Sequence, residues 1–530
     1  MMEENEIQLG DGLTYAKSYY IMGICDKGPT NEPIKIENIT QAHEMFGIND
    51  VTRAWHEAHS VMGNEANYYI TRINGTPSEF MVFGHRLNQS SNGGLMSEQY
   101  KAINLISYHS GEVWDECNIT FTEDYIQINN PESIGGSASF YYEDHPTMGQ
   151  LTEAINESFH AGEIGIMASC YNQFDDVNDI KEMYKDTYYS PLYFSDGEDQ
   201  IEVTKNELHE LLDMTYNILE GRVIDIFSII GAYFDDINPI DYYGDTNYGK
   251  LYYSVDRDYL TNQHQIYPWR SVTFHGQAID FCKRQMKQGI LTHCVMAFNP
   301  VESVEEILKV NSYSMKVADA SCLNDRFDIV EEGSNGDVID NGKYISLVLG
   351  EFLYQDHNGM SYYNNGFVAY GAYLASNLSA SSPTNDIIPH ISTIRYNLDD
   401  DEIDYMGRLG VVTFRKSILK QAIVVSNGVT AALFDSPFHV VSNVRMVQLI
   451  LNAYNSVLQA FVGQDVDRLM KTKAIDKTIE LITTALISDG VAKNIVPRLT
   501  ISPVGVALLE LDVLCNYSIE YVKATTNIKL

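Results

Sequence analysis

A short histidine–glutamate segment is the first place in this sequence where metal chemistry is conceivable. Residues 55–59 read Trp-His-Glu-Ala-His, one residue short of the HExxH helix motif that binds zinc. His56 and His59 are three positions apart and would share one helix face, but no third ligand is in view. We therefore interpret the two histidines as a structural pair and predict no metal site.

The motifs of nucleotide and nucleophile chemistry are missing from the sequence. It has no Walker A segment, no GxGxxG after the apolar stretch 222–230, and no GxSxG elbow. The loop 235–258 is rich in Asp, Tyr and Gly, which would suit calcium or a sugar, but the EF-hand order is absent. We interpret it as a solvated surface loop, and the acidic run 399–404 as a solvated linker. No catalytic residue, cofactor or enzymatic activity is predicted.

Charge and composition exclude further classes of protein. The chain has 530 residues and a formal net charge of −37, whereas nucleic-acid binding needs basic stripes that neutralise phosphates. No apolar run reaches the ~18 residues of a membrane span, so we predict no membrane insertion. The acidic N-terminus does not resemble a signal peptide, and the seven cysteines form no CxxC pair. We expect reduced thiols in a protein made in a cytoplasm.

The order of apolar and turn patterns predicts an α/β (α+β) multidomain chain. Strands alternate with helices between 204 and 377, which predicts a parallel sheet with right-handed crossovers. The predicted parts are residues 1–19, the first part of an α/β core (20–84), a β-rich insertion (85–200), an α/β domain (201–400), a C-terminal core domain (401–510) and a last strand (511–530); the family resemblance described below implies that 1–19 and 511–530 are arms and that the insertion is an outer domain.

Apolar spacing and turn residues also predict the individual elements. Strands are predicted at 20–24, 34–36, 68–73, 102–108, 117–121, 125–128, 222–230, 291–297, 344–349, 506–513 and 517–525. Helices are predicted at 52–62, 148–160, 276–287, 301–310, 367–377, 443–463 and 466–487, and Thr40, Thr147 and Thr204 are predicted as N-caps.

The stretch 405–464 stands out because it holds a single acid, Asp435, in a strongly acidic chain. It reads as strand, strand and helix, and its basic residues are Arg408, Arg415, Lys416, Lys420 and Arg445. Such a stretch is either a buried block or a face that meets something negative. We favour the packed C-terminal core.

Two regions carry motifs in an order that resembles one family. The first holds Gly23, Lys27, Gly28, Pro29, Glu32, Pro33, Phe46, Gly47 and the strand end 69–72 with Arg72. The second holds Gly410, Val411, Val412, Arg415, Val424, Val425, Gly428, Val429, Thr430, Asn443, Val444 and Arg445. The chain resembles the contractile tail sheath proteins, which form the outer cylinder of myophage tails, pyocins and related injection machines. The resemblance covers 20–75 and 400–530, follows 200–390 in outline and is weak over 85–200.

The resemblance implies a fold and a function. The fold would be a sheath core with a parallel or mixed sheet flanked by helices, a β-rich inserted domain and extended terminal arms that pair with neighbouring subunits. The function would be that of a virion structural subunit, which polymerises as a helical cylinder around the tail tube and contracts to drive the tube through the host envelope. The implied partners are further copies in stacked hexameric rings, the tail tube protein, and baseplate and neck or terminator proteins.

The resemblance also assigns residues to contacts. The helix after residue 464 would contact the tube through Arg468, Lys471, Lys473 and Lys477. The alternative is a solvated helix in which Asp465, Asp467, Asp476 and Glu480 balance these charges. The terminal strands that would pair with neighbours include Ile7, Thr14, Tyr517, Ile519 and Tyr521. The alternative for the C-terminal strand, 517–525, is an ordinary edge strand in its own sheet.

Three other functions stay open at this point. The chain is expected in a phage tail, but a sheath from an injection particle without a genome would carry the same motifs. A tail-completion or baseplate ring protein would share the fold. An α/β enzyme acting on carbohydrate would instead use the tyrosine-rich loops as sugar platforms.

Overall fold

The computed structural model of the protein describes residues 17–89, 95–232, 274–297, 330–332, 338–356, 358–377, 382–395, 398–408, 410–432, 434, 436–458, 461, 473–501 and 507–515. The predicted loop 235–258, the predicted helix 301–310 and the predicted strand 517–525 lie outside these residues, as does nearly all of the predicted N-terminal arm.

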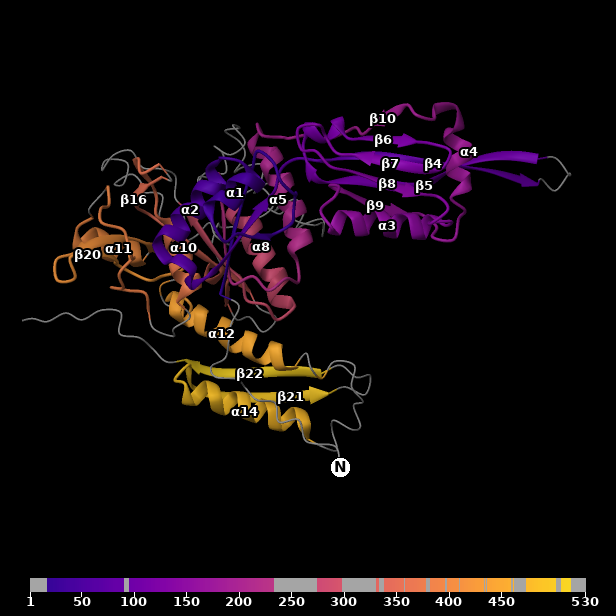
Figure 1. The fold of residues 1–530 in the computed structure, drawn as a ribbon. Helices are drawn as coiled ribbons and strands as arrows, with labels where there is room; N and C mark the ends of the chain where they lie inside the picture. Colours follow the sequence, from indigo (N-terminus) through magenta and orange to yellow (C-terminus); the bar gives the residue numbers. More distant parts are fainter. Residues whose placement is uncertain are drawn as a thin grey trace, which may run out of the picture.

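A seven-stranded sheet forms the centre of the molecule and confirms the prediction of a mostly parallel sheet (Figure 1). Neighbouring strands are parallel except β2 and β3. In spatial order the strands are β18 (Val411–Val412), β15 (Ile345–Val348), β12 (His293–Ala297), β11 (Ile226–Ile229), β1 (Ser18–Gly23), β3 (Asn67–Arg72) and β2 (Ile34–Lys35). The sheet thus joins strands that lie far apart in the sequence.

Helices cover both faces of this sheet because its strands carry apolar residues on both sides. Tyr19 and Ile21 of β1 pack with α1 (Ile39–Phe46), α2 (Asp50–Met62) and α10 (Phe367–Ser376). The alternate residues Tyr20 and Met22 pack on the other side. There they meet α5 (Lys205–Leu219), α8 (Phe274–Lys287) and α12 (Val441–Leu458). No helix in the described part of the chain is both long and apolar enough to span a membrane.

Several helices begin directly after a residue whose side chain caps the first backbone amides. Thr147 and Thr204 each form a capping box at the predicted positions. The predicted cap Thr40 is wrong, because α1 begins at Ile39 and the Asn38 side chain accepts from the Gln41 amide. The acidic run 399–404 is not a linker either. It enters helix α11 (Asp400–Arg408), where Asp399 and Glu402 each accept from the other's backbone amide. Acidic residues suit the positive N-terminal end of a helix.

A second unit, with its own apolar core, extends from the sheet (Figure 1). Three antiparallel strands, β4 (Pro77–Gln89), β5 (Leu95–Ser110) and β9 (Ile166–Cys170), form one of its sheets. The other contains β10 (Pro191–Tyr193), β6 (Asn118–Phe121), β7 (Tyr125–Asn129) and β8 (Ser137–Tyr141). The helices α3 (Met148–His160) and α4 (Asn178–Tyr184) complete it. Strands β4 and β5 are far longer than the strand predicted at 102–108.

Smaller elements complete the described part of the chain. Antiparallel hairpins are formed by β13 (Val330–Glu332) with β14 (Val338–Asp340), β16 (Glu351–Gln355) with β17 (Ser361–Asn365), and β19 (Phe414–Ser417) with β20 (Ala422–Val425). Near the C-terminus, α14 (Ala474–Ser488) packs with α12 and with a ribbon of β21 (Ala492–Ile501) and β22 (Ala507–Cys515). The sequence predicted β22 but not β21.

Candidate functional site

The N-terminal motif residues meet at the ends of β1 and β3, where two glycines allow a close approach. Gly28 has a φ of 106°, and a Cβ there would lie 2.7 Å from the Phe46 ring. Gly47 has a φ of 89°, and a Cβ there would lie 2.3 Å from an Asp26 carboxylate oxygen. Only glycine suits such positions, since other residues would combine left-handed backbone strain with a steric clash. The motif therefore has a local structural cause.

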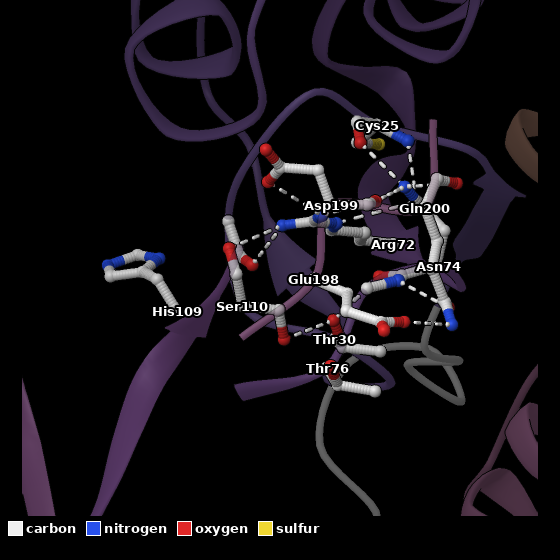
Figure 2. A network of polar contacts seen from close by, with 12 residues as sticks. Cys25, Thr30, Arg72, Asn74, Thr76, His109, Ser110, Glu198, Asp199 and Gln200 are labelled. Atoms are coloured by element: carbon white, nitrogen blue, oxygen red, sulfur yellow. Dashed lines mark hydrogen bonds and ion pairs between the residues drawn. The ribbon is translucent and has the colours of Figure 1, made fainter. Parts of the chain in front are cut away.

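Arg72 forms the centre of a polar network beside these glycines (Figure 2). Its side chain is fully buried, and one guanidinium nitrogen, Nη1, donates to Gly28 O and to Ser110 O, each at 3.0 Å. The other, Nη2, donates to Asp199 O at 3.1 Å. Burial lowers the pKa of Arg72, and the Asp199 carboxylate acts against that shift. Three backbone carbonyls thus replace the water that the charge gave up on folding.

These contacts place the guanidinium at the two crossings, the points where the chain passes from the central sheet into the inserted unit and back. Arg72 itself ends β3, just before the chain enters the inserted unit at β4, and Asp199 lies just after β10, where the chain returns. Ser110 ends β5 within the inserted unit, at the base of the β4–β5 hairpin. Asn74 supports the same crossing, because its Nδ2 donates to Asp199 O at 2.7 Å and to Cys25 O at 2.9 Å. We name this set, Gly28, Arg72, Asn74, Ser110 and Asp199, the arginine junction.

The junction leaves no room for larger groups. A Cβ at Gly75 would lie 2.4 Å from Arg72 Nη2. His109, drawn beside the network in Figure 2, stacks on Trp114 with ring centroids 5.6 Å apart. Burial lowers the pKa of His109 to about 4, so it is neutral at pH 7. The junction has the properties of a rigid mechanical connection rather than of a reactive centre.

A second buried arginine connects helices across the opposite part of the molecule. Arg445 Nη2 donates to Leu374 O at 2.9 Å, and Nη1 donates to the Gln448 side chain. Gln448 in turn donates to Asp225 O at 2.9 Å, and the Asp225 carboxylate accepts from the Ser18 amide at 3.1 Å. Burial lowers the pKa of Arg445 and raises that of Asp225, and each group opposes the shift of the other. The chain of contacts links α10, α12, β11 and β1.

The other C-terminal motif residues also have structural environments. Gly410 has a φ of 78°, and a Cβ there would lie 2.5 Å from Thr430 O. The Asn443 side chain donates to Pro437 O. Arg415 is partly exposed and donates to Asn385 Oδ1 at 2.6 Å. Of the two interpretations of the acid-poor stretch, burial holds for the described side chains of α12, which are buried or half-buried, whereas part of the β19–β20 hairpin is exposed.

The ribbon of β21 and β22 is the candidate surface for strand exchange. Within the described residues each strand pairs only with the other, so each has one open edge. Pro497 of β21 stands opposite Leu511 of β22. A proline has no N–H and is tolerated only where that N–H would point away from the partner strand. The open edge of β21 therefore lacks one donor, while β22 contains no proline.

The structure describes only part of the predicted contact set. Lys473 and Lys477 lie exposed at the start of α14, and Asp476 and Glu480 are exposed on the same helix. Arg468 and Lys471 lie outside the described residues, as do Ile7, Thr14, Tyr517, Ile519 and Tyr521. His59 stacks on Trp55 at 4.8 Å, and no group of three or more metal-ligating side chains occurs within the described ranges.

Asn74, Ser110, Asp199, Asp225 and Gln448 were not predicted as site residues. Their contacts mostly involve backbone carbonyls and partners far apart in sequence, which leave no residue pattern. The only local signal was the turn pair formed by Asn74 and Gly75.

Comparison with known proteins gave matches among solved structures alone. No protein-family model matches the sequence, and no curated protein matches it. The sheath tail protein of Desulfitobacterium hafniense matches with a TM-score of 0.42 and 12% identity, over 97% of this chain and 99% of that one. A sheath tail protein of Listeria innocua matches with a TM-score of 0.47 and 12% identity, over 95% and 96%. The contracted helical sheath of the anti-feeding prophage matches over 48% of this chain and 74% of that one, with a TM-score of 0.32 and 12% identity.

The chain thus has structural matches to sheath tail proteins over nearly its whole length, and to the sheath of a contractile injection system over about half. All three TM-scores are below 0.5.

Proposed function

We propose that this chain is a structural, non-enzymatic subunit of a contractile tail sheath, which polymerises around a tail tube and shortens to drive that tube through a host envelope. One observation carries the proposal. The two regions whose motifs resemble sheath proteins, 20–75 and 400–530, contribute β1, β3 and β18 to the same sheet. Arg72 and Arg445, one from each region, are both buried in networks that brace this sheet.

Assembly would proceed by strand addition. The terminal segments of one copy would add to the open edge of the ribbon in a neighbour, so that backbone hydrogen bonds connect the subunits. We favour the edge of β22, because Pro497 removes a donor from the edge of β21. Each backbone hydrogen bond is worth only about 1 kcal/mol net. Several bonds in each arm, repeated over a whole cylinder, would nevertheless keep the subunits joined while the array changes its dimensions.

Contraction would move rigid subunits about these flexible connections. The arginine junction suits such motion, because it fixes the inserted unit to the central sheet at both crossings. Lys473 and Lys477 would face an acidic tube. Exposed ion pairs of this kind are worth about 0–1 kcal/mol each and are screened by salt, so the grip on the tube could be released. Baseplate and neck proteins would bind the two ends of the cylinder.

Electron microscopy of the purified chain at high concentration tests the proposal. Long hollow cylinders with regular striation are the expected result. Closed rings would instead favour a tail-completion or baseplate protein. A chain that stays monomeric at every concentration and salt level would refute assembly into a sheath.

A further inference from the structure

The tip of the β19–β20 hairpin exposes two large aliphatic side chains. Ile418 is 91% exposed and Leu419 is 96% exposed, in the turn between Ser417 and Ala422. Turns usually carry Gly, Asn, Asp, Pro or Ser, which satisfy the backbone without apolar groups. Ile418 and Leu419 contribute nothing to the core of their own chain. Single exposed apolar residues are common, but two adjacent ones at a projecting turn indicate a contact with another molecule.

The same tip is basic. The Lys416 side chain is exposed and forms no hydrogen bond or ion pair with the described residues, and Lys420, directly after Leu419, donates from its ammonium to Asn385 O. The hairpin belongs to the stretch 405–464, which holds one acid in a chain of net charge −37. Copies of such a chain repel one another through their net charge. A locally basic, apolar projection is therefore the kind of element that suits an acidic surface of another copy.

A small cavity on the C-terminal unit has the complementary chemistry. It lies between α14 and β21 and has a volume of about 280 Å³. The apolar side chains of Ile479, Pro497 and Leu499 line it together with Asp476, Glu480, Thr483 and Thr484. The two threonine hydroxyls already donate to Ile479 O and Glu480 O within their own helix. Asp476 and Glu480 are exposed and have no ion-pair partner among the described residues.

The size of the cavity favours a side chain as its occupant. Small-molecule sites typically enclose about 300–1,000 Å³, so a cavity of about 280 Å³ suits one or two aliphatic side chains better than a cofactor. The hairpin and the cavity lie on different parts of the subunit, as the positions of β20 and α14 in Figure 1 show. A copy that keeps this fold cannot fill its own cavity with its own tip.

We propose that the Ile418–Leu419 tip of one copy inserts into the cavity between α14 and β21 of a second copy, with Lys416 near Asp476 and Glu480. This inference rests on the proposed function and adds which surfaces meet. Such a contact is heterologous, since each copy keeps one free tip and one free cavity after pairing. Contacts of this type propagate without closing unless the rotation happens to form a ring, as a helical cylinder requires.

Polymerisation assays on full-length variants test the contact. The double substitution Ile418→Asp plus Leu419→Asp changes only exposed side chains, so folding is retained. It should raise the concentration needed for assembly about tenfold or more, equivalent to at least ~1.4 kcal/mol per contact. Phe174→Asp is the matched control, because Phe174 is 80% exposed on the inserted unit and should leave assembly unchanged. Equal assembly of the tip variant and the control would overturn the proposal.

A charge exchange tests the pairing of the two surfaces. Glu480→Lys should weaken assembly, and adding Lys416→Glu to the same chain should restore part of the loss. If Glu480→Lys weakens assembly while the tip variant does not, the cavity binds something other than the tip, and the proposal is wrong. A wild-type chain that forms cylinders, together with a tip variant that forms them equally well, would reject this contact but not the proposed function.

Cross-linking provides a readout that does not need cylinders. A Leu419→Cys chain mixed with a Thr484→Cys chain should form a disulfide-linked pair under mild oxidation. Each single variant alone gives the background from the natural cysteines. A mixture that yields no more cross-link than the single variants would contradict the contact, whatever the outcome of polymerisation.

Discussion

Replacement of Arg72 by methionine removes the group that holds both crossings of the inserted unit. Methionine keeps a long unbranched side chain but has no N–H donor. Three backbone carbonyls, Gly28 O, Ser110 O and Asp199 O, lose their donor at 3.0–3.1 Å. Gly28 and Ser110 are buried, so water cannot replace the lost hydrogen bonds at their carbonyls without opening the structure, whereas Asp199 is half-buried.

The expected loss in the free energy of unfolding is about 3–5 kcal/mol. This range follows from about 1–3 kcal/mol for each buried carbonyl that is left without a donor, here Gly28 O and Ser110 O. It is smaller than a sum over three charge-assisted hydrogen bonds of roughly 1.5–3 kcal/mol each, because the wild type also bears the cost of burying the guanidinium. The stability of the Arg72→Lys variant should lie between those of the wild type and the methionine variant. Its ammonium keeps the charge but cannot reach all three carbonyls, because it lacks the planar fork of arginine.

Denaturant unfolding combined with amide hydrogen exchange measures this effect. The amides of Thr76 and Gly111, which bond across the crossings to Glu198 O and Thr76 O, should lose protection first in the methionine variant. Amides of β12, in the central sheet, should keep theirs under native conditions. A change below ~1 kcal/mol with unaltered protection at Thr76 and Gly111 would refute the mechanical role of the junction.

Three further predictions concern single sites. Burial raises the pKa of Glu57 from 4.5 to about 7, so the wild type loses stability as the pH rises from 4.5 to 7. The Glu57→Gln variant should therefore be more stable than the wild type by roughly 3 kcal/mol at pH 8, but not below pH 4.5. A difference in thermal unfolding that does not change with pH would contradict this. Gly28→Ala should lower the free energy of unfolding by roughly 2–4 kcal/mol, measured from the denaturant midpoint. Gly63 also has a positive φ, but a Cβ there would have nothing within 4 Å, so Gly63→Ala should lower it by only ~1–2 kcal/mol. Equal losses would show that the steric clash at Gly28 does not matter. Lys473→Glu plus Lys477→Glu should weaken salt-dependent co-sedimentation with an acidic tube protein without changing thermal stability, and unchanged binding would exclude these lysines from the tube contact.

Much of the central sheet was predictable from the sequence because its strands are short apolar runs between helical patterns. The segments around β11, α8, β12, β15 and α10 all follow this rule. The place of β1 between β11 and β3 was not predictable, since strand order depends on tertiary packing. The β4–β5 hairpin was missed because polar residues interrupt its apolar ones, although Val82 in β4 and Ala102, Ile103 and Leu105 in β5 are buried.

The candidate site was predictable in part for a related reason. Gly28, Gly47 and Gly410 leave a mark in the sequence because their backbone conformations require glycine. Arg72 and Arg445 were marked as motif residues, but their roles depend on the carbonyl groups of Ser110, Asp199 and Leu374. Every residue presents a similar backbone carbonyl, so no sequence pattern identifies such an acceptor.

A helical reconstruction of cylinders assembled from the full-length chain would show directly how the subunits are joined. In each subunit, the open edge of β22 should be paired with a terminal strand that belongs to a neighbouring copy. Terminal strands that fold back onto their own subunit, or cylinders joined without any shared sheet, would contradict it.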